Sequence, residues 1–96
     1  MREAMDYILD PEGNKVMIEA EQKSMKQNLA EQYVRMRKDM KLTQEQVSRR
    51  SGIPRSNIAR FESGRYNPSL ELMVKMAASM GLKVQIQLVP DKEARG

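Results

Sequence analysis

Four side chains that form directional hydrogen bonds gather in one short segment, residues 55–63. They are Arg55, Ser56, Asn57 and Arg60. An arginine presents a planar fork that matches O6 and N7 of guanine in the DNA major groove, and serine and asparagine pair with phosphates or base edges. If the segment is a helix that buries Ile58 and Phe61, the four polar side chains point outward. The pattern favours a helix that reads nucleic acid over an ordinary surface helix with solvated arginines.

Positive charge is concentrated around this segment. Residues 35–65 hold nine lysines and arginines against three acids, whereas residues 1–34 hold four against seven. The whole chain carries a formal charge of +4. A basic stretch of this kind suits a polyanion, although the solvated face of ordinary helices would contain the same residues. The acidic first third is an expected surface for a basic protein partner.

The residues on which most enzymes and metal sites depend are missing. The chain has neither cysteine nor histidine, which removes disulfides, thiolate nucleophiles and the usual ligands of transition metals. We therefore expect a binding protein without metal or cofactor, and no enzyme. No apolar run approaches the ~20 residues of a membrane span, and the N-terminus lacks the pattern of a signal peptide. A cytoplasmic location without a membrane partner is expected.

A helix and a tight turn are predicted directly before the polar segment. Thr43 followed three residues later by Gln46 is the capping-box pattern, which starts a helix. Gly52 should end that helix, because glycine tolerates the left-handed conformation found at many helix ends. Pro54 suits the first turn of the next helix. Two short helices, 43–50 and 55–63, joined by a glycine turn have helix-turn-helix geometry, centred on residues 43–62.

Two further helices should frame this pair. Apolar residues recur at helical spacing over 28–40, which predicts a helix there. A weakly amphipathic helix over 15–25 is expected to precede it, either as a separate helix or as a continuous one. Ser69 should cap the last helix and Gly81 should end it. Residues 10–14 form a dense turn cluster. The residues before that cluster fit a helical turn and a short extended piece equally well.

Residues 83–89 alternate between polar and apolar, as does a strand with one buried face. Val84, Ile86 and Leu88 share the apolar face. A single strand cannot satisfy its own backbone hydrogen bonds, so it needs a partner: residues 5–9, or the same strand of a second copy across a twofold axis. We favour the second copy, because a dimer also places two polar helices about 34 Å apart, one DNA turn. The other interpretation is an extended tail packed on its own domain.

The middle of the chain resembles the lambda-repressor/Cro-like helix-turn-helix family. The resemblance spans about residues 29–82 and rests on Arg37, the run LTQEQV at 42–47, the run GIPRSNI at 52–58, Glu62-x-Gly64-x-x-x-Pro68 and Ala77-x-x-Met80-Gly81. It implies a mainly α fold, a bundle of about four to five helices in which 55–63 is the recognition helix. It also implies an ion pair between Arg37 and Glu62. Two residues depart from the family pattern: Ser48 replaces the usual alanine, which predicts looser packing between the two helices, and Lys41 replaces a common glycine.

The resemblance also implies DNA contacts at the positions of Gln44, Arg55, Ser56 and Arg60, with Gln44 bracing the backbone or a neighbouring side chain. Helix N-termini favour phosphate, which adds Thr43, and the loop after the recognition helix offers further polar residues. The full predicted DNA-binding set is Thr43, Gln44, Arg55, Ser56, Asn57, Arg60, Arg65 and Asn67.

The strand that follows the domain extends the resemblance to antitoxins of the HigA and HipB groups. That likeness implies an autorepressor that binds a palindromic operator as a homodimer and neutralises a toxin protein. The alternatives are a stand-alone transcriptional regulator and a protein-interaction module that has lost DNA binding. We expect a partly helical N-terminal extension over 1–26, the DNA-binding domain over 27–82, a dimerisation strand over 83–90 with Val84, Ile86 and Leu88, and a tail over 91–96.

Overall fold

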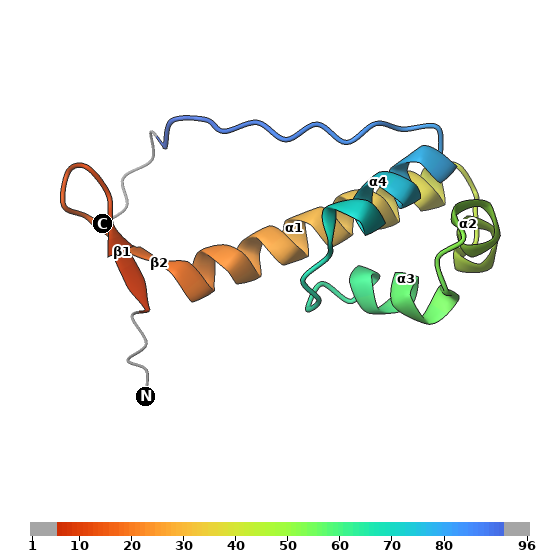
Figure 1. The fold of residues 1–96 in the computed structure, drawn as a ribbon, viewed down its shortest axis with the longest axis horizontal. Coiled ribbons are helices and arrows are strands. Elements are labelled where there is room, and N and C mark those ends of the chain that lie inside the picture. The colour runs from red at the N-terminus through yellow and green to blue at the C-terminus, as the bar shows by residue number, and fades with distance from the viewer. Residues whose placement is uncertain (1–5, 92–96) are drawn as a thin grey trace.

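The computed structural model describes residues 6–91 and is mainly helical (Figure 1). A β-hairpin leads into a long helix, which three shorter helices follow. The elements are β1 (Tyr7–Leu9), β2 (Lys15–Met17), α1 (Ile18–Asp39), α2 (Gln44–Ser51), α3 (Arg55–Glu62) and α4 (Leu70–Ser79). Helix α3 packs on the long helix α1, and α2 packs on α3 and α4. After α4 the chain runs back alongside α1 as an extended segment (Figure 1). No helix among the described residues is long and apolar enough to cross a membrane.

The predicted turn at 10–14 closes the hairpin. The carboxylate of Asp10 accepts hydrogen bonds from the backbone N–H groups of Glu12 and Asn14, at 3.0 and 2.9 Å. The chain therefore folds back, and β1 pairs with β2 in antiparallel register, Ile8 opposite Val16. The prediction of a helix from residue 15 was wrong at its start, because residues 15–17 use their backbone groups in this pairing. Helix α1 begins at Ile18 and continues without a break to Asp39.

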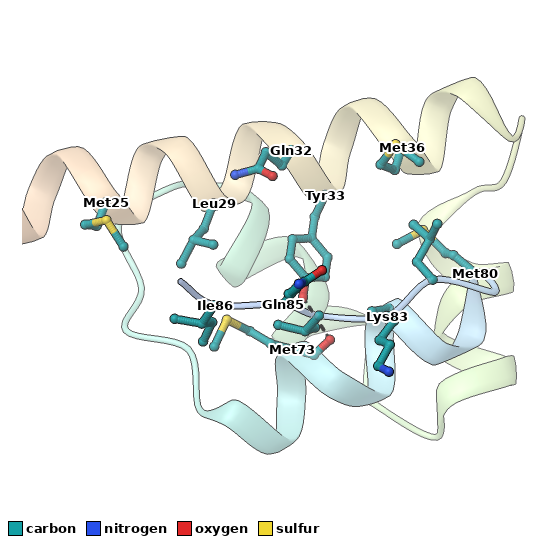
Figure 2. A pocket seen from close by; sticks show the side chains of 13 residues that line it. Met25, Leu29, Gln32, Tyr33, Met36, Met73, Met80, Lys83, Gln85 and Ile86 are labelled. Atoms are coloured by element: carbon teal, nitrogen blue, oxygen red, sulfur yellow. Dashed lines mark hydrogen bonds between the residues drawn. The ribbon is translucent and has the colours of Figure 1, made fainter. Parts of the chain in front are cut away.

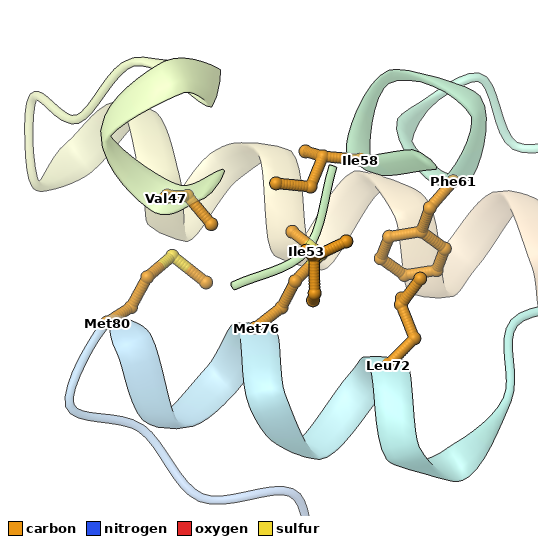
Figure 3. Close-up of a cluster of buried hydrophobic side chains, with 7 residues drawn as sticks. All are labelled: Val47, Ile53, Ile58, Phe61, Leu72, Met76 and Met80. Atoms are coloured by element: carbon orange, nitrogen blue, oxygen red, sulfur yellow. The ribbon is translucent and has the colours of Figure 1, made fainter. Parts of the chain in front are cut away.

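The core lies where α2, α3 and α4 meet the C-terminal half of α1. Figure 3 shows its buried side chains, Val47, Ile53, Ile58, Phe61, Leu72, Met76 and Met80. Tyr33 of α1 closes the core with its ring edge-on to Phe61, the centroids 4.9 Å apart. Its hydroxyl donates to the carbonyl oxygen of Met73 at 2.9 Å, and burial raises the pKa of Tyr33. The phenol therefore stays protonated and keeps linking α1 to α4.

The bounds of the two motif helices lie within one residue of the predicted ones, 43–50 and 55–63. Thr43 accepts from the backbone N–H of Gln46 at 3.0 Å, and the Gln46 side chain accepts from the backbone of Thr43 at 2.8 Å, so the capping box is confirmed. Gly52 ends α2 with φ 79°. Ser48, expected to loosen the packing, donates its hydroxyl to the carbonyl of Ile53 at 2.5 Å. The hydroxyl thereby joins α2 to the turn.

Arg37 and Glu62 form the ion pair that the resemblance implies. Arg37 Nε lies 2.7 Å from Glu62 Oε2, and Nη2 lies 2.9 Å from Oε1. Nη1 donates to the carbonyl of Leu42 at 2.9 Å. The side chains are only 11% and 7% exposed, and the hydrogen bond to Glu62 is the main cause that raises the pKa of Arg37. One guanidinium thus ties α1, the loop after it and α3 together.

The segment after α4 is extended, but the structure describes no strand in it. Val84 and Ile86 line an apolar pocket of about 350 Å³ together with Met25 and Leu29 of α1 and Met73 of α4 (Figure 2). Leu88, further along, is 97% exposed. Within residues 6–91, β1 pairs with β2 in a two-stranded sheet, so this segment is not the partner of the first strand. Its first residues pack on their own domain and its later ones do not.

The buried ion pair predicts a large loss of stability for Glu62→Gln. The change removes the charge that compensates the buried Arg37 guanidinium, and breaking such a pair costs up to several kcal/mol. We expect a decrease of about 2–3 kcal/mol in the free energy of unfolding, measured by urea denaturation. Glu71→Gln is the matched control, because Glu71 pairs with Lys75 on the surface, where such a pair contributes about 0–1 kcal/mol. Equal losses in the two variants would contradict this account.

Lys41 predicts a gain of stability on substitution by glycine. Its φ is 58°, a left-handed conformation that costs a non-glycine residue about 1 kcal/mol or more. We expect Lys41→Gly to raise the free energy of unfolding by about 0.5–1 kcal/mol after the added chain entropy of glycine is subtracted. Lys41→Ala removes the same charge but keeps the strain, so it should give no gain. If both variants were stabilised alike, the cause would be charge and not backbone conformation.

Candidate nucleic-acid interface

Helix α3 buries one face and presents the other to solvent. Ile58 and Phe61 are almost completely buried, which follows from their three-residue spacing on a helix. Arg55, Ser56 and Arg60 are exposed and Asn57 is half-buried. The outward face therefore carries two guanidinium groups and a hydroxyl, and the structure brings these three predicted residues onto one surface. Asn57 lies at its edge.

The N-terminal end of α2 is held beside α3 by Gln44. Its side-chain amide donates to Oε1 of Glu62 at 2.9 Å, on the same carboxylate that binds Arg37. The resemblance implies that Gln44 braces the backbone or a neighbouring side chain, and in the structure it braces the side chain of Glu62. The bond sets the first turn of α2 close to α3. A helix N-terminus in this position favours a phosphate.

A first basic depression lies at the start of α3. Thr43, Gln44 and Arg55 line it, together with Lys38 and Lys41 from the end of α1 and the loop after it. Its volume is about 500 Å³, and Arg37, Leu42 and Glu45 complete the lining. The sequence reasoning missed Lys38 and Lys41 as interface residues. Their closeness in sequence to Thr43, in the most basic part of the chain, is the signal that was available.

A second basic depression lies beyond the other end of α3. Arg65 and Asn67 of the α3–α4 loop face residues of the N-terminal half of α1 across it, and its volume is about 610 Å³. Its lining comprises Glu19, Gln22, Lys23, Lys26, Gln27, Gly64, Arg65 and Asn67. The predicted DNA-binding residues are therefore divided into three groups. One belongs to each depression, and the outward face of α3 lies between them.

The side chain of Arg60 contacts an aromatic ring. Its guanidinium carbon lies 5.4 Å from the centre of the Tyr66 ring, within the range of a cation–π contact. The contact restricts the side chain to the end of α3 that leads to the second depression. Tyr66 is not in the predicted DNA-binding set, and its contact with Arg60 gives it a role in positioning a residue of that set.

The cations of this surface are not neutralised by ion pairs. In the described part of the chain, the salt bridges are Arg37–Glu62 and Lys75–Glu71, so Arg55, Arg60 and Arg65 have none. Each depression contains one acid, Glu45 or Glu19, against more than one free cation. The surface has the net positive charge that attracts a polyanion. Residues 6–91 hold no group of acids that could bind a metal ion.

Comparison with known proteins identifies the same region. The family described as helix-turn-helix matches residues 35–86. An uncharacterized HTH-type transcriptional regulator of Archaeoglobus fulgidus is 38% identical over 52 residues, which cover 54% of this chain and 73% of the relative. The immunity repressor protein of Bacillus phage phi105 is 41% identical over 49 residues, 51% of this chain but 34% of that protein. An uncharacterized HTH-type regulator of Methanocaldococcus jannaschii is 41% identical over 44 residues, 46% of this chain and 67% of the relative.

No solved structure matches the chain. The family match contains the capped α2, the glycine turn and α3. The chain belongs to the lambda-repressor-like helix-turn-helix family of DNA-binding transcriptional regulators, which is not a family of enzymes.

Proposed function

We propose that the protein is a sequence-specific repressor that reads a palindromic operator with α3 in the major groove. The observation that carries the proposal is the exposed face of α3 between two basic depressions. A major groove is about 12 Å wide and admits one helix, with a phosphate backbone along each wall. A recognition helix with cations at both ends matches that arrangement. The repressor role is supported by the similarity to a phage immunity repressor.

The proposed contacts follow from the three groups of residues. Arg55, Ser56 and Arg60 face base edges, where an arginine fork contributes about 1–3 kcal/mol of discrimination. Thr43 and Gln44, at the start of α2, bind phosphate on one wall of the groove. Arg65 and Asn67 bind phosphate on the other wall, and Asn57 contributes from its half-buried place on α3. A protein engaged with DNA in this way acts in the cytoplasm of a bacterial-type cell.

We further propose a homodimer in which the extended segments of two copies pair. In that segment Ile86 is 67% exposed, Leu88 97% and Val89 71%, and the described residues supply no strand beside it. Unpaired backbone and exposed apolar side chains together favour an intermolecular sheet. A twofold contact of this strand is self-complementary, and it brings a second α3 to the second half of a palindrome.

The finer proposal is an autoregulating antitoxin of the HigA or HipB kind. It is supported by the order of the parts, a helix-turn-helix domain followed directly by an extended apolar segment, and by the acidic composition of residues 1–34, a surface for a basic toxin. The alternatives are a stand-alone regulator and an interaction module without DNA binding. A toxin gene beside the chain's own gene, with an inverted repeat in the shared promoter, separates the antitoxin from the stand-alone regulator.

DNA binding should depend on Arg55 and Arg60. We expect Arg55→Ala/Arg60→Ala to weaken binding at least about 30-fold, because each lost bidentate contact costs about 1–3 kcal/mol. The assay is fluorescence anisotropy at about 0.15 M salt, on the operator duplex found by footprinting the chain's own promoter. Arg49→Ala is the matched control, since Arg49 is exposed on α2 and lines neither depression. Unchanged binding by the double variant would favour the interaction module.

The dimer should depend on one face of the extended segment. Ile86→Lys/Leu88→Lys places two charges in the proposed sheet interface. We expect sedimentation equilibrium to give the monomer mass for this variant. Gln85→Lys/Gln87→Lys carries the same added charge on the opposite face of the same segment, so it should remain dimeric. A wild-type chain that is monomeric at micromolar concentration, or two variants that behave alike, would refute this interface.

A further inference from the structure

The second basic depression is built largely by a part of the chain outside the family match. The match begins at residue 35, whereas the α1 side of the depression consists of residues between Glu19 and Gln27. This side exists because α1 is a single helix of 22 residues that continues well beyond the core. It brings Lys23 and Lys26, three residues apart and thus on one helix face, opposite Arg65.

The position of the loop against α1 is fixed by Gly64. This residue is buried and has φ 81°. A Cβ built on it would lie 3.6 Å from the Cα of Gln27 and 3.9 Å from the Cβ of Ala30. The loop backbone therefore rests directly on the helix, and the positive φ favours glycine there. As a result, Arg65 and the two lysines keep a set position relative to α3, which ends at Glu62 with Ser63 as its C-cap.

The chemistry of the depression suits a chain of phosphates. It offers three cations, Lys23, Lys26 and Arg65, and the side-chain amides of Gln22, Gln27 and Asn67, against the single carboxylate of Glu19. None of the three cations has an ion-pair partner among residues 6–91. Side-chain amides and cations are the groups that bind phosphate and sugar oxygens in protein–DNA complexes.

We propose that this depression binds the sugar–phosphate backbone of duplex DNA next to the base pairs read by α3, with Lys23 and Lys26 as phosphate ligands. The inference rests on the proposed DNA-binding function and adds contacts that the matched domain does not contain. The long α1 thereby lengthens the DNA contact of each protomer. Because the ligand groups are phosphates, the added contacts strengthen binding without reading sequence.

The test uses Lys23→Gln/Lys26→Gln in the full chain, with Arg49→Gln/Lys75→Gln as control. The control removes the same two charges outside both depressions. The probe is the duplex that the wild-type chain selects from a random library, and affinity is measured between 50 and 200 mM salt. Each lost phosphate contact lowers the slope of log affinity against log salt by about 0.9. We expect a decrease of about 1.8 for each bound protomer.

The same slope difference sets the expected change in affinity. The ratio of wild-type to Lys23/Lys26-variant affinity should decrease about 12-fold for each protomer as salt rises fourfold, from 50 to 200 mM. Trimming the flanks of the duplex should weaken the wild type and leave the variant nearly unchanged, because the variant no longer holds those phosphates. Thermal unfolding midpoints equal to that of the wild type confirm that both variants fold.

Three outcomes would overturn the proposal, and they differ in what else they affect. A variant with the slope and affinity of the control shows that the depression does not bind DNA, while the role of α3 stands. If the Lys23/Lys26 variant captures an acidic protein more weakly than the wild type does, but keeps the wild-type slope with DNA, the depression binds a protein partner instead. If the wild-type chain selects no duplex at all, the proposed function fails and this inference fails with it.

Discussion

The guanidinium of Arg37 and the carboxylate of Glu62 meet where α1, α2 and α3 converge, and the geometry of the whole interface depends on this contact. Arg37 also binds the carbonyl of Leu42, and Glu62 also accepts from Gln44. Each charged group therefore makes three hydrogen bonds, which offset part of the cost of removing it from water. An apolar pair could hold the helices together, but it would not fix their angle through directional bonds. The ion pair orients the recognition helix and the start of α2 as one unit.

The core that carries this unit is small, and it explains why the rest of the chain extends from it. Seven buried side chains from α2, α3, α4 and the turn form the centre (Figure 3). Only the second half of α1 contributes to it, through Tyr33 and Leu29. The first half of α1 projects past the core toward the hairpin (Figure 1). Because that half lies outside the core, it can present charged side chains beside the α3–α4 loop, where they form part of the proposed DNA contact.

The proposed dimer depends on the extended segment after α4. Its first residues pack against α1 and α4, which accounts for the half-buried Val84 (Figure 2). Beyond Ile86 the apolar side chains leave the domain and lie in solvent. Within one chain nothing in the described residues pairs with this backbone. A second copy would cover the exposed side chains and at the same time supply the twofold symmetry that a palindromic operator requires.

Turns and helix ends depend on residues a few positions apart, and the sequence alone predicts them. The Thr43–Gln46 capping box, the Gly52 turn and the Asp10 turn are made by hydrogen bonds and backbone preferences local to each site, so their residues predict them. The resemblance added one distant contact, Arg37–Glu62. Tertiary structure decided the rest. Lys15–Met17 became a strand because β1 lies beside it, although its residues also suit a helix. Lys23 and Lys26 joined the surface of α3 because the loop at Gly64 seats against a helix some forty residues earlier in the chain. Such contacts join residues far apart in sequence, and no local pattern encodes them.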